Sequence, residues 1–226
     1  MSLRLVTPSL AISDLPAYLL KQLNAFFPCA QPDDEKLLVG AVERALPRME
    51  LIFSHVRHAP YRHEGAPAFD IFHSDQYATF VWLVSNEIFK AVGPHPLAKR
   101  LFCLNKALHG LNCIYDVELP PIFLFIHIVG SVIGKASYGN YFVALQGCTI
   151  GAVRGEYPVI GERFIMSSGC TVIGKCQIGD GVMLGPSTTL FETDVEPRTL
   201  ITGHYLHGLT KKPLQGERAF EWHFTH

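Results

Sequence analysis

The chain has 226 residues, of which 48% are hydrophobic and 17% are charged, and its formal net charge is −1. This composition predicts a soluble protein with a sizeable core, and the length allows one or two domains. The sequence has no basic cluster and no apolar run of about 18 residues, so neither nucleic-acid binding nor a membrane span is predicted. The first residues lack the apolar stretch of a signal peptide, and we therefore expect a cytoplasmic protein.

The N-terminal part of the chain has the periodicity of helices. Asp14-Leu15-Pro16 predicts the start of a first helix, because proline is favoured in the first helical turn, and this helix should end near Pro28. The acidic run Pro32-Asp33-Asp34-Glu35 predicts the start of a second helix. Pro47 lies inside this second segment and should kink or stop the helix.

Two further helices are expected after a long loop over residues 56–72. The third helix should begin near His73, with Ser74 or Asp75 as its cap, and stop at Gly93. The fourth should extend from about Pro96 to Gly110. Both segments are apolar on more than one face, which predicts burial against each other or against another subunit.

From Ile160 a six-residue period replaces the helical one. Every sixth residue is apolar at six successive positions: Ile160, Met166, Val172, Ile178, Leu184 and Leu190. Four places after each of the first five stands another small or apolar residue: Phe164, Cys170, Cys176, Val182 and Thr188. In a half-apolar chain, six hits in one phase have a chance probability of roughly one in sixty. A period of six is typical of a three-sided coil in which each hexad forms one side and stacks its aliphatic residue inside.

The period extends upstream to Tyr138, with one interruption. The step from Ile150 to Ile160 spans ten residues instead of six, so four extra residues must bulge out between positions 151 and 158. A loop that interrupts a solenoid at one place usually serves a site. About ten hexads predict roughly three turns. We expect a helical domain over residues 1–115, a coil over residues 116–203 and a tail over residues 204–226.

The six cysteines form no metal-ligand or C-x-x-C pattern, and we interpret them as structural. They are Cys29, Cys103, Cys113, Cys148, Cys170 and Cys176. No metal is expected in this protein.

Three motifs can be compared with a known family. They are His127-Ile128-Val129-Gly130-Ser131-Val132-Ile133-Gly134, Leu145-Gln146-Gly147-Cys148-Thr149-Ile150-Gly151 and Tyr157-Pro158-Val159-Ile160-Gly161. With a helical domain before them and hexads after them, they resemble the bacterial serine acetyltransferases of the hexapeptide-repeat superfamily, from about Asp75 to Thr202. The resemblance implies an α+β fold in which a helical N-terminal domain precedes a short left-handed parallel β-helix.

The resemblance also implies an activity and partners. The activity is O-acetyl transfer in cysteine biosynthesis, with acetyl-CoA as co-substrate in the cleft between neighbouring coils and a small acceptor that carries a hydroxyl or amine. The assembly is a homotrimer, or a hexamer joined through the helical domains. For acetyl-CoA we expect contacts with backbone groups near Gly151, Ala152, Ser168 and Gly185.

The general base of the family corresponds to His127. Transfer of acetyl from a thioester to a hydroxyl needs a base for the hydroxyl proton, and a neutral imidazole, with an ordinary pKa near 6.5, suits this role. A carboxylate on the other ring nitrogen would fix the tautomer and stabilise the imidazolium. The resemblance assigns that carboxylate to Asp116, with Glu118 as a second candidate, although the segment between acid and histidine is about four residues shorter here. The alternative for His127 is a structural histidine in an apolar segment.

Acceptor recognition is where the sequence departs most from the family. The family has an acid before the histidine and Arg-His before the loop proline, whereas this chain has Ile126 and Glu156-Tyr157. Tyr157 and Arg154 are therefore candidate acceptor contacts. His73 and Asp75 stand where the family places an acid near the acceptor's amino group, and a helix cap is their alternative role.

Other functions remain open at this stage. The lost carboxylate-binding residues favour an acetyltransferase acting on a sugar or polysaccharide precursor on the same scaffold. A non-catalytic trimeric binding module is a further alternative. Zinc-dependent hydration of carbon dioxide is disfavoured, because His127 is the only histidine between Gly110 and Gly203.

Overall fold

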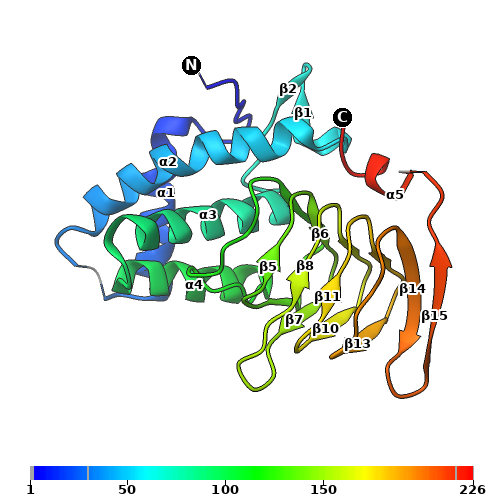
Figure 1. Ribbon diagram of the computed structural model, residues 1–226. Coiled ribbons are helices and arrows are strands. Elements are labelled where there is room, and N and C mark those ends of the chain that lie inside the picture. Colours follow the sequence, from blue (N-terminus) through cyan, green and yellow to red (C-terminus); the bar gives the residue numbers. More distant parts are fainter. Residues whose placement is uncertain (1–2, 30, 217, 226) are drawn as a thin grey trace. The chain divides into compact units, whose positions relative to one another are not determined.

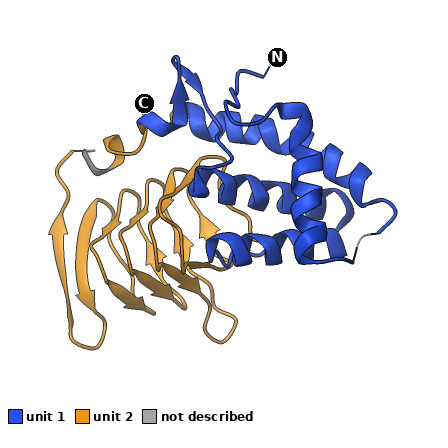
Figure 2. Cartoon of the chain, turned by 180° about the vertical axis from the view of Figure 1, so that it is seen from behind, with its two compact units in different colours: residues 1–54, 59–116 blue, residues 55–58, 117–226 orange. Residues whose placement is uncertain are grey.

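The computed structural model describes residues 3–29, 31–216 and 218–225, and the chain forms two compact units (Figure 2). Unit 1 comprises Met1–Ser54 and Ala59–Asp116, and unit 2 comprises His55–His58 and Val117–His226. Within the described ranges, no helix is long and apolar enough to cross a membrane.

Unit 1 is mainly helical (Figure 1). Its elements are η1 Ile12–Asp14, α1 Leu15–Phe26, α2 Asp34–His55, η2 Ala59–Tyr61, β1 Arg62–His63, β2 Ala66–Pro67, α3 Ser74–Val92 and α4 Pro96–His109, the last residue of α2 falling in unit 2. The four expected helices are present. The expected mutual burial of the last two is confirmed, because the Ser85 hydroxyl of α3 donates a 2.7 Å hydrogen bond to the Ala98 carbonyl of α4.

Two details of the predicted helices differ in the structure: the second helix is not stopped at Pro47, and the third is not capped as expected. Pro47 neither stops α2, which continues to His55, nor prevents burial of Met49 and Phe53 beyond it. Each of those side chains contributes about 1.5–3 kcal/mol of burial, which offsets the roughly 3 kcal/mol cost of an internal proline. The N-cap of α3 is His73, whose alternative role was a helix cap, and neither Ser74 nor Asp75; the His73 side chain makes no capping hydrogen bond.

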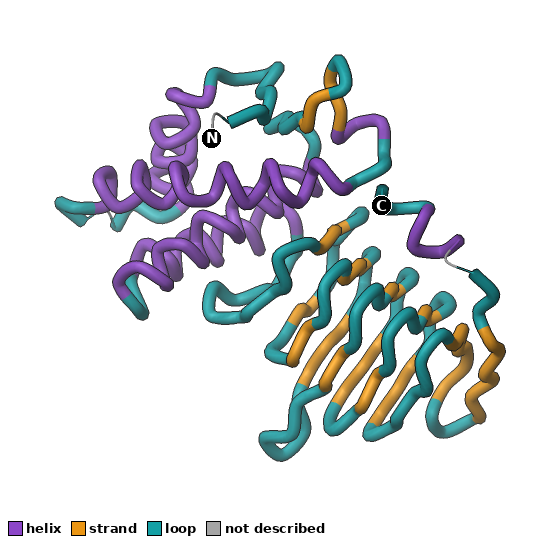
Figure 3. The backbone as a smooth tube through the Cα atoms, turned by 45° about the horizontal axis from the view of Figure 1, so that its top comes forward, coloured by secondary structure: helices purple, strands orange, loops and turns teal. Residues whose placement is uncertain are grey.

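Unit 2 contains a three-sided parallel β-helix, called the prism below (Figures 1 and 3). Face 1 contains β3 Phe123–Phe125, β6 Phe142–Ala144, β9 Ile165–Met166, β12 Met183–Leu184 and β14 Thr199–His204. Face 2 contains β4 Val132–Ile133, β7 Thr149–Gly151, β10 Thr171–Ile173 and β13 Thr189–Phe191. Face 3 contains β5 Ser137–Tyr138, β8 Val159–Ile160 and β11 Gln177–Ile178. The last elements are β15 Gly208–Pro213, antiparallel to β14, and α5 Arg218–Glu221.

The hexad interpretation is confirmed residue by residue. Ile160 pairs with Ile178, Met166 with Leu184 and Val172 with Leu190, each pair three hexads apart on one face. Every residue of both hexad sets is buried, from Ile160 to Leu190. The prism core is therefore a set of vertical aliphatic stacks.

The prism is longer than the sequence indicated. Five successive strands stack on face 1, which makes about five layers where three turns were expected. The predicted count missed one layer at each end. These are the layer that begins with β3 and the layer formed by β14, which do not follow the regular six-residue period. The expected four-residue insertion is confirmed, because Val143 pairs with Ile165, three hexads and four residues later.

We predict that Leu184→Ala lowers the free energy of unfolding by about 2–5 kcal/mol, because it opens a cavity inside a stack. Leu184 is fully buried between Met166 and Ile201. The matched control is Leu206→Ala, whose side chain is 66% exposed and whose effect should stay within about 0.5 kcal/mol. Chemical denaturation at one protein concentration measures both changes, and equal losses would contradict the stacked core.

Candidate functional site

The irregular segments of the prism lie at its three corners, because the inward side of each face is filled by stacked apolar side chains. Corner A joins faces 1 and 2, corner B joins faces 2 and 3, and corner C joins faces 3 and 1. Phe125 pairs with Ala144 and Val132 with Thr149, so six residues form corner A in the first layer and four form it in the second. The first layer therefore has a two-residue bulge at corner A.

His127 lies on this bulge. Its backbone has a φ of 50°, in the left-handed region that few residues other than glycine adopt, and its side chain is exposed. Ile128, which follows it, is buried and anchors the bulge to the core. In the layer below, the side-chain oxygen of Gln146 is buried and has no hydrogen-bond partner in the described part of the chain. The bulge thus presents an imidazole to solvent beside an unsatisfied acceptor.

The four-residue insertion forms a small hairpin at corner B. The backbones of Val153 and Glu156 exchange hydrogen bonds of 3.1 and 2.9 Å across Arg154-Gly155. Both turn residues have positive φ, 53° and 81°, as a two-residue hairpin turn requires. Arg154, Glu156 and Tyr157 are all exposed, so the hairpin projects three polar side chains from corner B.

The residues expected to bind acetyl-CoA fall on two corners. Ser168 and Gly185 follow β9 and β12 at corner A, below the His127 bulge. Gly151 and Ala152 lie at corner B, where the hairpin begins. A single chain therefore does not bring the four together, and each pair accompanies one of the two irregular segments.

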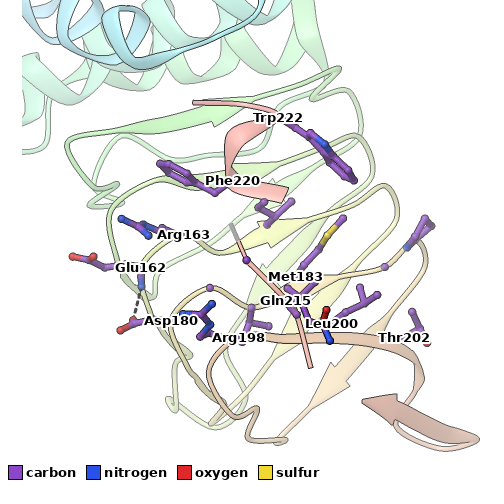
Figure 4. Close-up of a pocket in the computed structure, with 17 residues that line it drawn as sticks. Glu162, Arg163, Asp180, Met183, Arg198, Leu200, Thr202, Gln215, Phe220 and Trp222 are labelled. Atoms are coloured by element: carbon purple, nitrogen blue, oxygen red, sulfur yellow. Dashed lines mark hydrogen bonds between the residues drawn. The ribbon is translucent and has the colours of Figure 1, made fainter. Parts of the chain in front are cut away.

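A cavity of about 650 Å³ lies over face 1 (Figure 4). Its floor is formed by Ile165, Met183 and Leu200, and it borders corner A at Gly185 and Thr202. The C-terminal segment supplies the rest of the wall through Leu214, Gln215, Gly216, Phe220 and Trp222. Its volume is within the usual range for small-molecule sites, about 300–1,000 Å³.

Charged residues line the cavity along corner C. Arg163 and Arg198 lie two layers apart, with Gly181 at the same place in the layer between them, and Glu162 and Asp180 are the carboxylates beside them. The Arg163 guanidinium lies 4.8 Å from the centre of the Phe220 ring, which is a cation–π distance. The Glu162 backbone N–H donates a 2.8 Å hydrogen bond to the Asp180 carboxylate, drawn in Figure 4. The cavity therefore combines an apolar floor with two guanidinium groups.

The remaining predicted residues flank the prism in sequence. In unit 1, His73 packs its ring 5.4 Å from that of Tyr61, and Asp75 is buried in the first turn of α3. Burial, and then the charge of Asp75, raise the pKa of Tyr61, which keeps the phenol neutral. Asp116 is the last residue of unit 1, and Glu118 is exposed in unit 2.

Comparison with known proteins agrees with this architecture. No family model matches the chain. A serine acetyltransferase of Synechococcus elongatus is 27% identical over 114 residues, which are 48% of this chain and 46% of that protein. The soybean serine acetyltransferase apoenzyme structure is 25% identical, with a TM-score of 0.55 over 83% of this chain and 73% of that one. The chain is serine acetyltransferase-like.

Two further structures extend the likeness in fold. The Neisseria gonorrhoeae serine acetyltransferase has a TM-score of 0.69 and 18% identity, over 93% of this chain and 82% of that one. The Brucella abortus serine acetyltransferase has a TM-score of 0.67 and 14% identity, over 92% and 86%. The chain spans about half the length of the curated relative it matches.

Sequence reasoning missed most of the cavity in this serine acetyltransferase-like chain. Gly185 was the only predicted residue that lines it, whereas Arg163, Arg198 and Trp222 were not considered. The two arginines stand at the corner C place that Gly181 holds in the layer between them, which was a usable signal. Trp222 lies in the segment that we interpreted as a tail, and its sequence gives no period. Gln146 was also missed, although glutamine is unusual at a tight corner.

We predict that at most two of the six thiols of this serine acetyltransferase-like chain react rapidly with a thiol reagent at pH 8. Burial raises the pKa of Cys113, Cys148 and Cys176, and that of Cys170 to about 12, so these buried thiols are protonated and inaccessible. Cys29 is exposed and Cys103 is half-buried. Unfolding in denaturant should release all six, and rapid labelling of Cys148, Cys170 or Cys176 in the native protein would contradict a closed prism.

Proposed function

We propose that the protein is an acetyl-CoA-dependent O-acetyltransferase that acts on serine or a related small hydroxy compound. The observation that carries the proposal is the exposed imidazole of His127 on the corner A bulge, above Ser168 and Gly185. The imidazole takes the proton of the acceptor hydroxyl as its oxygen attacks the thioester carbonyl. The leaving CoA thiolate then takes a proton, and the acetyl ester of the acceptor is released.

A carboxylate partner for His127 completes this proposal. Asp116 is the first candidate and Glu118 the second, and either carboxylate would fix the imidazole tautomer and stabilise the imidazolium. A direct attack without a covalent enzyme intermediate needs no further nucleophile. The buried cysteines would also be unsuited to the role of a nucleophile, because their thiols are protonated and inaccessible.

The acting unit of this proposal is a homotrimer, with the site shared between chains. His127 lies at corner A, and the hairpin with Arg154 and Tyr157 lies at corner B. Within one prism these two segments therefore project from different edges. Both segments can touch one acceptor only if corner A of one chain faces corner B of the next. Cyclic symmetry then gives equivalent sites at every such seam.

Acetyl-CoA fits the features of corner A and of the cavity. We assign its thioester to His127 and its arm to backbone groups at Ser168 and Gly185, with Gly151 and Ala152 contributed by the next chain. The phosphates would then reach the cavity, where Arg163 and Arg198 offer guanidinium groups suited to bidentate phosphate contacts.

The residues of the corner B hairpin are the proposed contacts of the acceptor. Arg154 would hold the carboxylate of an amino acid. Glu156 and Tyr157, which replace Arg-His of the family, favour the alternative of a sugar or polysaccharide-precursor acceptor. A serine acceptor would place the protein in cysteine biosynthesis in the cytoplasm. Hexamers would require contact through the helical unit.

We predict that the purified protein releases free CoA from acetyl-CoA when it is given the correct acceptor. L-serine, homoserine, threonine and amino sugars form the test panel, and thiol release is the measurement. His127→Ala should reduce the rate at least about a hundredfold, because the general base is lost. His207→Ala, which removes an exposed histidine of the same unit, should have no effect. A response to sugars alone would rule out serine, and full activity of His127→Ala would rule out the mechanism.

We also predict that two inactive variants restore activity when they are mixed. One variant is His127→Ala, and the other is the hairpin double variant Arg154→Ala/Tyr157→Ala. After unfolding and refolding together in equal amounts, about a quarter of the sites in random trimers would combine an intact His127 with an intact hairpin. The mixture shows no recovery if one chain supplies both segments, and a fully active double variant would remove the hairpin from the site.

A further inference from the structure

The C-terminal segment of unit 2 returns to residues 55–58. Val56 and Phe224 form an antiparallel bridge, and both side chains are buried. The backbone N–H of Arg57 donates a 2.8 Å hydrogen bond to the His223 carbonyl, and that of Thr225 donates one of 2.8 Å to the His55 carbonyl. The end of the described chain is thus held by a short strand pairing.

This anchored segment is also one wall of the cavity over face 1. Phe220 and Trp222 line the cavity a few residues before the bridge (Figure 4). Phe220 is buried, with its ring 5.0 Å from that of Tyr141 on the prism. Trp222 is 61% exposed and therefore has little packing of its own, so its position depends on how the residues on either side of it are held. The wall is complete only while the end of the segment stays in place.

A pair of histidines joins the two sides of the anchor. His58 Nε2 and His223 Nδ1 are 3.1 Å apart, and the ring centres are 5.3 Å apart. A hydrogen bond between two imidazoles needs one N–H donor and one bare nitrogen as acceptor. When both rings are protonated, two donors and two positive charges face each other, and the bond is replaced by repulsion.

We propose that His58 and His223 form a proton-sensitive latch, which holds the C-terminal segment against residues 55–58 when it is neutral and releases it when it is protonated. The latch would control access to the cavity that we assign to acetyl-CoA, and this part rests on the proposed function. The release of the segment itself does not.

The surroundings of the pair do not favour a second positive charge. Among the described residues, the titratable groups on the two segments or packed against them include Arg57, His55, Glu221, Arg163 and Tyr141. The Arg57 guanidinium donates a 3.1 Å hydrogen bond to the backbone carbonyl of Glu221, and Arg163 lies over Phe220. Arg57 and Arg163 are permanent cations and Glu221 is an anion, so these fixed charges do not compensate two added protons on the pair.

The direction of the pH effect follows from the buried state of the rings. Burial, and then His58, lower the pKa of His223 to about 4, and burial lowers the pKa of His58. When the segment is released, His58 and His223 have ordinary pKa values near 6.5. The released state therefore binds protons more readily than the docked state. Docking is therefore favoured above pH 6.5, weakens as the pH falls below 6.5, and levels off near pH 4.

Hydrogen exchange of the peptide that contains residues 220–225 tests the latch. Labelling times are scaled for the intrinsic pH dependence of amide exchange. Protection should fall about tenfold between pH 7.5 and pH 5.5, the effect of one histidine shifted by this amount. The double variant His58→Gln/His223→Gln keeps hydrogen-bonding side chains that do not titrate, and its protection should be the same at both pH values. His207→Gln, at an exposed histidine of the same unit, should behave like the unchanged protein.

Acetyl-CoA binding, measured in the same samples, separates the two proposals. If the latch controls the cavity, the dissociation constant of acetyl-CoA should be up to about tenfold higher at pH 5.5 than at pH 7.5. This rise should occur only in proteins that keep both histidines. Absence of acetyl-CoA binding at both pH values, with pH-dependent exchange, would refute the proposed function and leave the latch standing. Equal protection at both pH values, or a double variant as pH-dependent as the unchanged protein, would overturn the latch. If the double variant does not fold, the single variant His223→Gln replaces it, with the same criteria.

Discussion

The in-register stacking of aliphatic residues is the constraint on which unit 2 depends. Each inward residue, such as Leu184, stacks on the residues directly above and below it on the same face and is fully buried. A face therefore tolerates no insertion, because one extra residue would turn an aliphatic side chain outward in that layer. Corners do not carry this restriction. Variation in chain length, and with it any chemistry, is confined to the edges of the prism.

Two edges show such variation, and they differ in kind. At corner A two extra residues lift His127 out of the column in a strained left-handed conformation. At corner B the four extra residues form their own hydrogen-bonded turn, which holds Arg154 at its tip. The first places one reactive group at the surface, and the second builds a rigid projection. Because the two segments are separated within one chain, we propose a site shared between chains.

The sequence was sufficient for the prism and insufficient for what covers it. A fixed period of six could be read directly, because every stack uses the same place in each hexad, and the hairpin followed from one break in that period. The continuation of α2 through Pro47 could not be read, because it depends on tertiary burial of Met49 and Phe53. The cavity wall was missed for a similar reason. Its anchor joins His58 to His223, two positions far apart in the chain that no local pattern connects.

The regular layering has a metric consequence. His127 belongs to the first layer of face 1 and Gly185 to the fourth, so three strand spacings separate them along corner A. At about 4.8 Å for each spacing, the interval is roughly 14 Å. Positions along corner A are therefore separated by whole strand spacings. The length of an extended donor molecule that binds along this corner would have to match that interval. Loss or gain of one layer would move the reactive end of such a molecule by one full strand spacing, and no side-chain rearrangement could restore its position.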